Sequence, residues 1–534
     1  MSKDRPNILL LHTDQQRFDT IAGWGASHVL TPGRDGRGRD GTTFRCAYSS
    51  NPVCMPARHD LLTGASARHH GYWRNGPRPI RTHRLATVPR LLTEAGYQTV
   101  ALGKMHYYPP REHHGFAHME LMEELPACRE DDAYLQYLDR VGYGHVRCQH
   151  GVRPLFHFTP QASRVPPRHH GTAWVGHRTE QWLRAGRDRP VFIFASWIAP
   201  HPPFYVPESF LDMYRDRDLP APCGAGESPV RQTPALPARN DGRILKRIRE
   251  AYCAAITHVD EQVGRILDVL EETGQLEETL IIFTSDHGEM LGDRGNYLKR
   301  VPYEGSAHIP LIVRGPGFAA NTACDTAVTT WDIAATILET AGVHVPSDHP
   351  LAGRPLGELV TDTHRIALFH HGRDRERYIA ACDGRFKFMH WYNGGDEELY
   401  DLHHDPWEQH NLAAAHDSAN PLRRACIAFE EEHGQAERVR NGEMVDLPFE
   451  TPDPYRFSRY PWGSPQQFPV WTDGYDPDDL EAIRRELLEA AGSEAAHICG
   501  DPAWREHARQ CWQAIAKDAT LYDRLFERFP GDSE

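Results

Sequence analysis

The sequence has no hydrophobic run long enough to cross a membrane and no cysteine pattern typical of a disulfide framework. The longest apolar stretch, 191–199, is far shorter than the roughly 20 residues that a spanning helix needs. The 11 cysteines are an odd number without a Cys-x-x-Cys pair, which argues against a zinc knuckle as well. The N-terminus carries no apolar segment of signal-peptide length. We therefore expect a cytoplasmic protein with no membrane partner.

Basic residues are also in deficit. The 534 residues include 59 Lys and Arg against 74 Asp and Glu, which gives a formal net charge of −15. Proteins that bind nucleic acid through general electrostatics are normally basic, so nucleic acid is not expected as a partner. Hydrophobic residues make up 40% of the chain and charged residues 25%, as in ordinary globular proteins. This length predicts roughly two to four domains, or one large domain with an appendage.

Five apolar runs lack polar alternation, and each leads into polar residues. Continuous runs of this kind are typical of parallel strands covered on both faces. The runs are 7–13, 97–102, 191–197, 280–285 and 310–313. Helical patterns at 85–95 and 244–273 lie between them, and each is followed by a glycine, which commonly ends a helix. The alternation predicts an open α/β sheet, and ligands of such sheets bind at the carboxyl ends of the strands.

The pattern changes after about residue 365. Short β-rich runs at 366–369, 377–382 and 386–390 are split by glycine turns, which predicts an antiparallel meander. The predicted fold class is α/β, with a large, mixed but mostly parallel sheet flanked by helices and a smaller C-terminal α+β subdomain. We place the two domains at 1–365 and 366–534, with an extension from about residue 420. An irregular segment is expected at 441–478, followed by amphipathic helices near 478–491 and 502–526.

One short segment places a cysteine at the start of a predicted helix and an arginine one turn further on. The residues at 54–58 read Cys-x-Pro-x-Arg, and Leu-Leu-Thr-Gly follows at 61–64. Proline suits the first turn of a helix, and Gly64 suits its end. Cys54 then lies at a helix N-terminus, where free N–H groups and the dipole favour an anion. Taken alone, the pattern also fits a buried cysteine beside a helix cap.

Together with the strand ends, this segment resembles the signature of the sulfatase family, in the alkaline phosphatase-like superfamily. The resemblance covers roughly residues 5–415. Its other motifs are Arg-Pro-Asn-Ile at 5–8, Gly-Lys-Met-His at 103–106, Ala-Pro-His-Pro at 199–202, Ser-Asp-His-Gly-Glu at 285–289, and the stretches 299–316 and 398–413. The resemblance implies hydrolysis of sulfate monoesters. It also implies that a formylglycine-generating enzyme oxidises Cys54 to formylglycine.

The resemblance further implies a divalent metal. Its ligands would be Asp14, Gln15, the converted Cys54, Asp286 and His287. Oxygen-rich sites suit hard ions such as Ca²⁺, the expected metal, whereas a thiolate suits them poorly, which independently supports the conversion of Cys54. Gln15 stands where many sulfatases have a second Asp, and His287 where many have Asn. These departures leave Mn²⁺ and Mg²⁺ as alternatives.

The catalytic groups follow from the same resemblance. One hydroxyl of the hydrated aldehyde would attack sulfur, while Arg58, Lys104 and Lys299 hold the sulfate oxygens. His201 matches the general acid that protonates the leaving alcohol. His106 matches the base that allows sulfate to be expelled. Histidine ordinarily titrates near neutrality, which suits both tasks.

Three hypotheses remain open at this point. The first is a sulfatase that acts on a small-molecule or saccharide sulfate ester. The second is a phosphonate monoester or phosphodiester hydrolase with the same nucleophile; Gln15 and His287 permit it, and Lys104 with His106 argues against it. The third, an inactive sulfatase-like binding protein, is disfavoured because no metal or proton-transfer group is missing. The sequence leaves open the sulfated alcohol and the oligomeric state, for which a homo-oligomer is one alternative.

Overall fold

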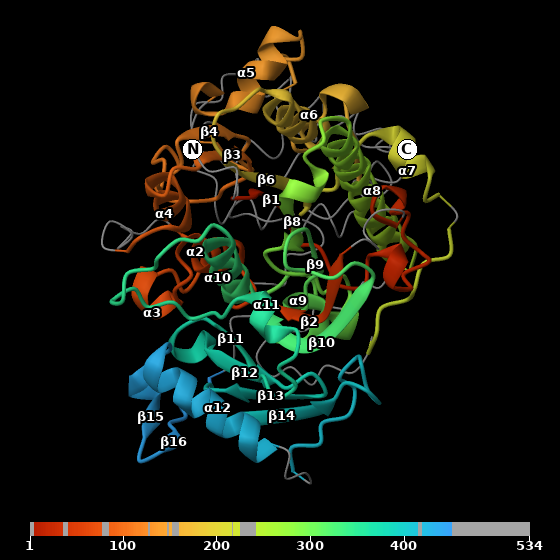
Figure 1. Ribbon diagram of the computed structural model, residues 1–534. Coiled ribbons are helices and arrows are strands. Elements are labelled where there is room, and N and C mark those ends of the chain that lie inside the picture. The colour runs from red at the N-terminus through yellow and green to blue at the C-terminus, as the bar shows by residue number, and fades with distance from the viewer. Residues whose placement is uncertain are drawn as a thin grey trace, which may run out of the picture.

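The structure is a computed structural model of the 534-residue chain. It describes residues 5–35, 41–76, 85–126, 129–146, 149–151, 160–215, 217–224, 242–414 and 419–450. Figure 1 shows a large sheet with helices on both faces and a smaller sheet beside one end of it. The predicted helices near 478–491 and 502–526, and most of the predicted irregular segment at 441–478, lie outside the described residues.

The large sheet has eight strands in the order β10-β2-β9-β8-β1-β6-β3-β4. Its strands are β1 (Asn7–Asp14), β2 (Thr42–Tyr48), β3 (Gln98–Gly103), β4 (His118–Leu121), β6 (Val191–Pro200), β8 (Thr279–Ser285), β9 (Leu311–Arg314) and β10 (Thr322–Thr329). Neighbouring strands run parallel except at β9, which is antiparallel to both β8 and β2. The sheet is therefore mixed and mostly parallel, which confirms the predicted fold class.

Each face of this sheet carries its own hydrophobic core. Ile8 and Leu10 of β1 pack on one side, whereas Leu9 and Leu11 pack on the other. One face is covered by α2 (Cys54–Thr63), α4 (Val88–Glu94), α10 (Thr330–Thr340) and α11 (Leu356–Leu359), and the other by α5 (Ala133–Arg140), α6 (Gly171–Arg184) and α8 (Gly242–Glu272). Burial on both sides explains why the run at 7–13 has no polar alternation. The predicted helices at 85–95 and 244–273 are confirmed as α4 and α8.

The parallel direction expected for the run at 310–313 is wrong. Its residues form β9, whose partners Ile282 and Phe283 on β8 run the opposite way. An antiparallel strand covered on both faces has the same continuous apolar sequence as a parallel one, so the pattern does not report direction. Strands β2, β4 and β10 were not predicted. They mix polar and apolar residues, as in Thr-Thr-Phe-Arg-Cys-Ala-Tyr at 42–48, and therefore lack a continuous run.

The second sheet is an antiparallel meander, as predicted. Its strands are β11 (Ala367–His371), β12 (Tyr378–Cys382), β13 (Phe386–Trp391) and β14 (Asp396–Asp401), in that order. Ile379 and Ala381 of β12 pack with residues of α12 (Ala419–Glu432), while Tyr378 and Ala380 face the large domain. Figure 1 shows α12 on the far side of this sheet from the large one. The division of the chain at residue 365 stays a prediction.

The remaining α-helices and strands are short. They are α1 (Pro32–Asp35), α3 (Ala67–His70), β5 (Gln161–Ala162), β7 (Tyr205–Val206), α7 (Glu208–Asp212), α9 (Glu304–Ala307), β15 (Val439–Arg440) and β16 (Glu443–Met444). Among the helices that the structure describes, none combines the length and the apolar composition needed to cross a bilayer. Seven cysteines fall within the described residues, and all seven are free thiols.

Candidate active site and metal centre

Polar side chains from four strand ends meet at one edge of the large sheet. Asp14 is the last residue of β1, and Asp286 and His287 directly follow β8. Lys104 directly follows β3, and Ser196 of β6 pairs with Gly103, the last residue of β3. Strands β8, β1, β6 and β3 are consecutive neighbours and run parallel, so their carboxyl ends lie together. The predicted location of the site at this edge agrees with the rule for open α/β sheets.

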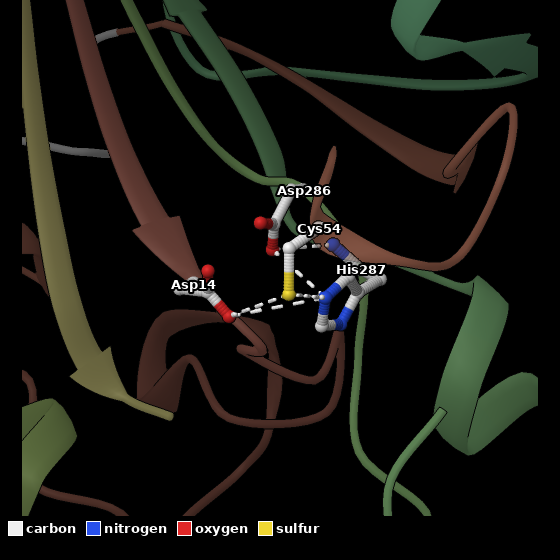
Figure 2. A group of neighbouring side chains, drawn as sticks. All are labelled: Asp14, Cys54, Asp286 and His287. Carbon is white, nitrogen blue, oxygen red and sulfur yellow. Dashed lines mark hydrogen bonds and ion pairs between the residues drawn. The ribbon is translucent and has the colours of Figure 1, made fainter. Parts of the chain in front are cut away.

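Cys54 is the first residue of α2 and points into this edge. Its Sγ lies 3.2 Å from His287 Nε2 and 3.8 Å from Asp14 Oδ1. The four side chains Asp14, Cys54, Asp286 and His287 are buried, and each offers a ligand atom within 4.8 Å of the others. Figure 2 shows the sulfur of Cys54 between Asp14 and His287, with Asp286 close to both Cys54 and His287. The structure therefore brings together four of the five predicted metal ligands.

Arg58 orients the two carboxylates of this group. Its Nε donates to Asp286 Oδ2 at 2.8 Å and its Nη2 donates to Asp14 Oδ2 at 3.1 Å. Nη1 donates to the Lys104 carbonyl and to Ser196 Oγ, so four of the five N–H groups of the guanidinium have protein acceptors. Both Oδ2 atoms are thus occupied by Arg58, and both Oδ1 atoms face His287 Nε2 at 3.8 and 3.5 Å.

The donor set fits a hard divalent cation. Two carboxylate oxygens and an imidazole nitrogen converge on residue 54, and oxygen donors are the preferred ligands of such ions. His287 Nδ1 lies 3.0 Å from the Gly288 carbonyl, which leaves Nε2 to face the cluster. Burial alone would lower the pKa of His287, but the charges of Asp286 and the Cys54 thiolate outweigh it and raise that pKa. The cluster therefore attracts positive charge, and a metal ion would take the place of that proton.

Gln15 connects the cluster to a lysine and a buried glutamate. Its backbone N–H donates to Asp286 Oδ1 at 3.0 Å, with φ of 68°. Its side-chain Nε2 donates to Glu289, and its Oε1 accepts from Lys299 Nζ. The assignment of Gln15 as a metal ligand stays a prediction, since its side-chain oxygen contacts Lys299 in this structure. The sequence predicted no role for Glu289, although this residue ends the motif Ser-Asp-His-Gly-Glu at 285–289.

Positive charge surrounds residue 54. Burial alone would raise the pKa of the Cys54 thiol, but Lys299, His287 and Lys104 outweigh it and hold that pKa well below its usual range. Lys104 Nζ lies 2.7 Å from Asp14 Oδ2. Burial would lower the pKa of Lys104, yet Asp14 and Glu124 raise it above its usual range. An anion at position 54 is therefore strongly favoured, as an oxyanion nucleophile requires.

His106 is held in place by a glutamate that sequence reasoning missed. Its backbone has φ of 54°, in the left-handed region that costs most residues roughly 1–2 kcal/mol. Glu123 Oε1 accepts from the N–H groups of Met105 and His106 at 2.9 and 2.8 Å and so stabilises this turn. A hydrogen bond from the side chain of His106 helps to lower the pKa of the Cys54 thiol. His106 thus lies next to the predicted nucleophile.

His201 lies between a carboxylate and a lysine. Its Nδ1 is 2.8 Å from Glu124 Oε1 and 2.6 Å from the Pro202 carbonyl, and its Nε2 is 2.9 Å from Lys299 Nζ. The structure thus joins the two predicted groups His201 and Lys299 directly. The sequence predicted no role for Glu123 or Glu124. They follow a strand that was not predicted, and two adjacent acidic residues in a sequence usually indicate exposed surface charge.

Asn75 lies at the start of α2. Its Oδ1 accepts from the backbone N–H of Met55 at 3.0 Å, which satisfies one of the free donors at the helix N-terminus. The structure assigns it a contact beside residue 54.

Comparison with known proteins agrees with this geometry. The profile of the sulfatase family matches residues 6–343, and the profile of the C-terminal region of N-sulphoglucosamine sulphohydrolase matches residues 292–425. An arylsulfatase of Clostridium perfringens is 30% identical over 449 residues, covering 76% of this chain and 90% of that protein. A choline-sulfatase of Rhizobium meliloti is 28% identical over 438 residues, covering 77% of this chain and 83% of that protein.

A solved structure is similar over most of its length. The crystal structure of a phosphonate monoester hydrolase of Agrobacterium radiobacter has a TM-score of 0.67 and 28% identity, and the match covers 82% of this chain and 96% of that one. The family match spans more than half of the 534 residues and includes every strand of the large sheet. The chain therefore belongs to the sulfatase family of the alkaline phosphatase-like superfamily and is a sulfuric ester hydrolase.

Proposed function

We propose that this chain hydrolyses sulfate monoesters of small molecules or saccharides, with a formylglycine made from Cys54 as its nucleophile. The observation that carries the proposal is the surroundings of residue 54. Two carboxylates, an imidazole and two lysines converge on this one buried position at the start of α2. A formylglycine-generating enzyme is the partner that maturation requires.

We further propose that a divalent cation binds to Asp14, Asp286, His287 and the converted residue 54, with Gln15 as a further ligand. Ca²⁺ is our first choice because the carboxylates supply hard oxygen donors, and Mn²⁺ and Mg²⁺ are the alternatives. When bound, the cation lowers the pKa of a hydroxyl of the hydrated aldehyde and so makes it a nucleophile near neutral pH.

The side chains of this chain would bind the sulfate group and move protons. Lys104 and Lys299 supply positive charge toward the sulfate oxygens, and Arg58 adds its charge while it fixes the two carboxylates. His201 donates a proton from Nε2 to the leaving alcohol. His106, in contact with residue 54, accepts the proton whose loss lets sulfate depart. The two histidines thus divide the acid and base work.

A phosphonate monoester hydrolase is the second candidate. The structural match to such an enzyme favours it, as do Gln15 and His287. Lys104 argues against it, because the family pattern of those relatives usually departs from Gly-Lys-x-His. The contacts of Lys104 with Asp14 and Glu124 support a role for this lysine in the proposed site.

A substrate panel tests the proposal. The chain is produced together with a formylglycine-generating enzyme and loaded with Ca²⁺, and Cys54→Ala is the control that cannot be converted. We expect kcat/KM for an aryl or sugar sulfate to exceed that for a matched phosphonate monoester and phosphodiester by at least about tenfold. A preference for the phosphonate ester would establish the second candidate instead. Converted, metal-loaded protein without activity on any of these esters would contradict both.

A further inference from the structure

We propose that Glu124 is a positioning residue that links the general acid His201 to the sulfate-binding Lys104. This inference rests on the proposed function and extends it to a residue outside the family motifs. Glu124 follows β4, the edge strand next to β3, which carries Lys104 at its end. Its side chain is 6% exposed, so its negative charge is buried at the site.

Each oxygen of Glu124 contacts one of the two partners. Oε1 lies 2.8 Å from His201 Nδ1, and Oε2 lies 2.8 Å from Lys104 Nζ. One carboxylate therefore spans two side chains that come from different strands. A single rigid link of this kind fixes the separation between a sulfate-binding charge and a proton donor.

The contacts of His201 determine which nitrogen can act. Nδ1 faces two acceptors, Glu124 Oε1 and the Pro202 carbonyl, so Nδ1 carries a proton. Nε2 accepts a hydrogen bond from Lys299 Nζ at 2.9 Å, and it can donate a proton to the leaving alcohol once Lys299 turns to the sulfate. A carboxylate behind an imidazole holds the useful tautomer and stabilises the imidazolium, which is the form that donates a proton from Nε2. Glu124 thereby prepares His201 to protonate the leaving alcohol.

The other titratable groups near His201 do not replace Glu124 in this task. Lys299 opposes a positive charge on the imidazole. His150, His170 and His258 line a cavity together with His201. Burial lowers the pKa of His170 to about 4 and holds the pKa of His258 well below its usual range, so both are neutral near pH 7. Glu124, by contrast, brings a negative charge to 2.8 Å from the His201 ring.

Lys104 gains a defined orientation from the same carboxylate. Its ammonium forms ion pairs with Asp14 and Glu124, at 2.7 Å from Asp14 Oδ2 and 2.8 Å from Glu124 Oε2. Asp14 still holds Lys104 when the charge at residue 124 is removed, so the main effect of that loss is expected at the proton donor His201.

The test is Glu124→Gln in converted, Ca²⁺-loaded enzyme, assayed on a series of aryl and alkyl sulfates of increasing leaving-group basicity. Glutamine preserves the shape and one acceptor but removes the charge. For the most basic leaving groups we expect kcat to fall by roughly 10- to 100-fold, and for the most activated aryl sulfate by less than about threefold.

A double-mutant cycle separates this role from simple packing. If Glu124 acts through His201, then Glu124→Gln should change the rate of His201→Ala by less than about threefold. Glu124→Asp keeps the charge and should therefore keep a leaving-group dependence closer to that of the wild type. This variant also provides the test if Glu124→Gln does not fold. Glu398→Gln is the matched control. Glu398 lies in β14 of the second sheet and is a similarly buried carboxylate, which accepts from Tyr303, Trp391 and Tyr400.

Two results would overturn the inference. One is an equal loss across the whole leaving-group series, and the other is a loss in the double variant equal to the product of the two single losses. Either would make Glu124 an ion pair that only supports the fold. A converted wild-type enzyme without sulfate-ester activity would instead refute the proposed function, on which this inference depends.

Discussion

Arg58 is the side chain on which the geometry of the two carboxylates depends most directly. It is fully buried and pairs with Asp14 and Asp286, which are buried as well. Removing one member of such a group leaves an uncompensated charge and commonly costs about 3–5 kcal/mol. Burial alone would raise the pKa of Asp286, but His287 and Arg58 hold that pKa below its usual range, so Asp286 stays ionised and able to bind a cation.

We predict that Asp286→Asn abolishes metal binding. The substitution removes one ligand charge and one partner of Arg58, so turnover should fall by more than about 100-fold and the melting temperature should fall as well. The metal content per folded chain, measured by elemental analysis, checks the prediction. Asp332→Asn is the control, because Asp332 is equally buried but caps α10. Full metal content in Asp286→Asn would remove this residue from the metal site.

We predict that His201→Ala harms poor leaving groups most. A general acid helps in proportion to the basicity of the departing oxygen, so an alkyl or sugar sulfate should lose roughly 100-fold or more while an activated aryl sulfate loses far less. Rates across a leaving-group series measure this slope. Parallel losses throughout the series would show that His201 does not supply the proton.

The candidate site residues that the sequence predicted are those that lie in short motifs. Asp14, Cys54, Arg58, Lys104 and His287 were assigned in this way, and the fold brings them together. The partners that orient them were not predictable. Glu123 and Glu124 acquire their roles only because β4 pairs with β3, a contact between segments that no local pattern reports. The contact of Gln15 with Lys299 likewise depends on how two distant loops meet.

At the level of elements, the end of β3 must pass very close to β6. Gly103 has φ of +92°, and a Cβ added there would lie 2.0 Å from the Ser196 carbonyl oxygen. Gly96, at the end of α4, has nearly the same φ of +94°, yet a Cβ there would meet nothing within 4 Å. The two glycines therefore differ in the space around them and share their backbone conformation.

We predict that Gly103→Ala destabilises the protein far more than Gly96→Ala does. The change at residue 96 should cost roughly 1–2 kcal/mol from the left-handed backbone alone. At residue 103 the close approach to β6 adds to that cost, and Lys104 should shift, so activity should fall as well. Thermal unfolding and kcat/KM of both variants measure the difference. Similar losses in the two variants would show that the tight contact between β3 and β6 is not required.

Helices and strands were predicted correctly where their hydrophobic pattern is regular. Buried parallel strands such as β1, β6 and β8 have continuous apolar sequences, and α8 has a clear helical period. The direction of β9 could not be predicted, because burial on both faces gives the same composition in either direction. Strand β10 lies at the edge of the sheet with β2 beside it, and the two strands keep exposed polar residues such as Asp325 and Arg45, which hide the strand pattern.

At the level of the whole molecule, a buried charged group joins the second sheet to the large domain. Lys387 of β13 contacts Glu304 of α9 and Glu408, and all three are buried. His308 and Tyr48 also bond to Glu304. Two carboxylates thus share one lysine. Burial raises the pKa of Glu408 to about 7 despite Lys387, whereas Lys387 and His308 outweigh burial at Glu304 and lower its pKa.

We predict that Glu408 makes stability fall between pH 5 and pH 8. A raised folded-state pKa means that the folded protein binds the proton more tightly, so folding loses free energy as pH rises from the ordinary value near 4.5 to about 7. Glu304 stays charged across this window and does not contribute to the change. In Glu408→Gln the loss disappears, so the melting temperature of the variant relative to the wild type should increase from pH 5 to pH 8. An unchanged difference at the two pH values would contradict this assignment.

The measurement that tests the account most directly is the chemical state of residue 54 in active enzyme. Preparations with graded conversion, made by varying co-expression of a formylglycine-generating enzyme, are assayed on an aryl sulfate and analysed by peptide mass spectrometry. The account predicts that the peptide containing residue 54 has lost sulfur and gained an aldehyde, and that activity per chain rises in proportion to the converted fraction. Full sulfate-ester hydrolysis by protein with an intact Cys54 thiol would contradict it.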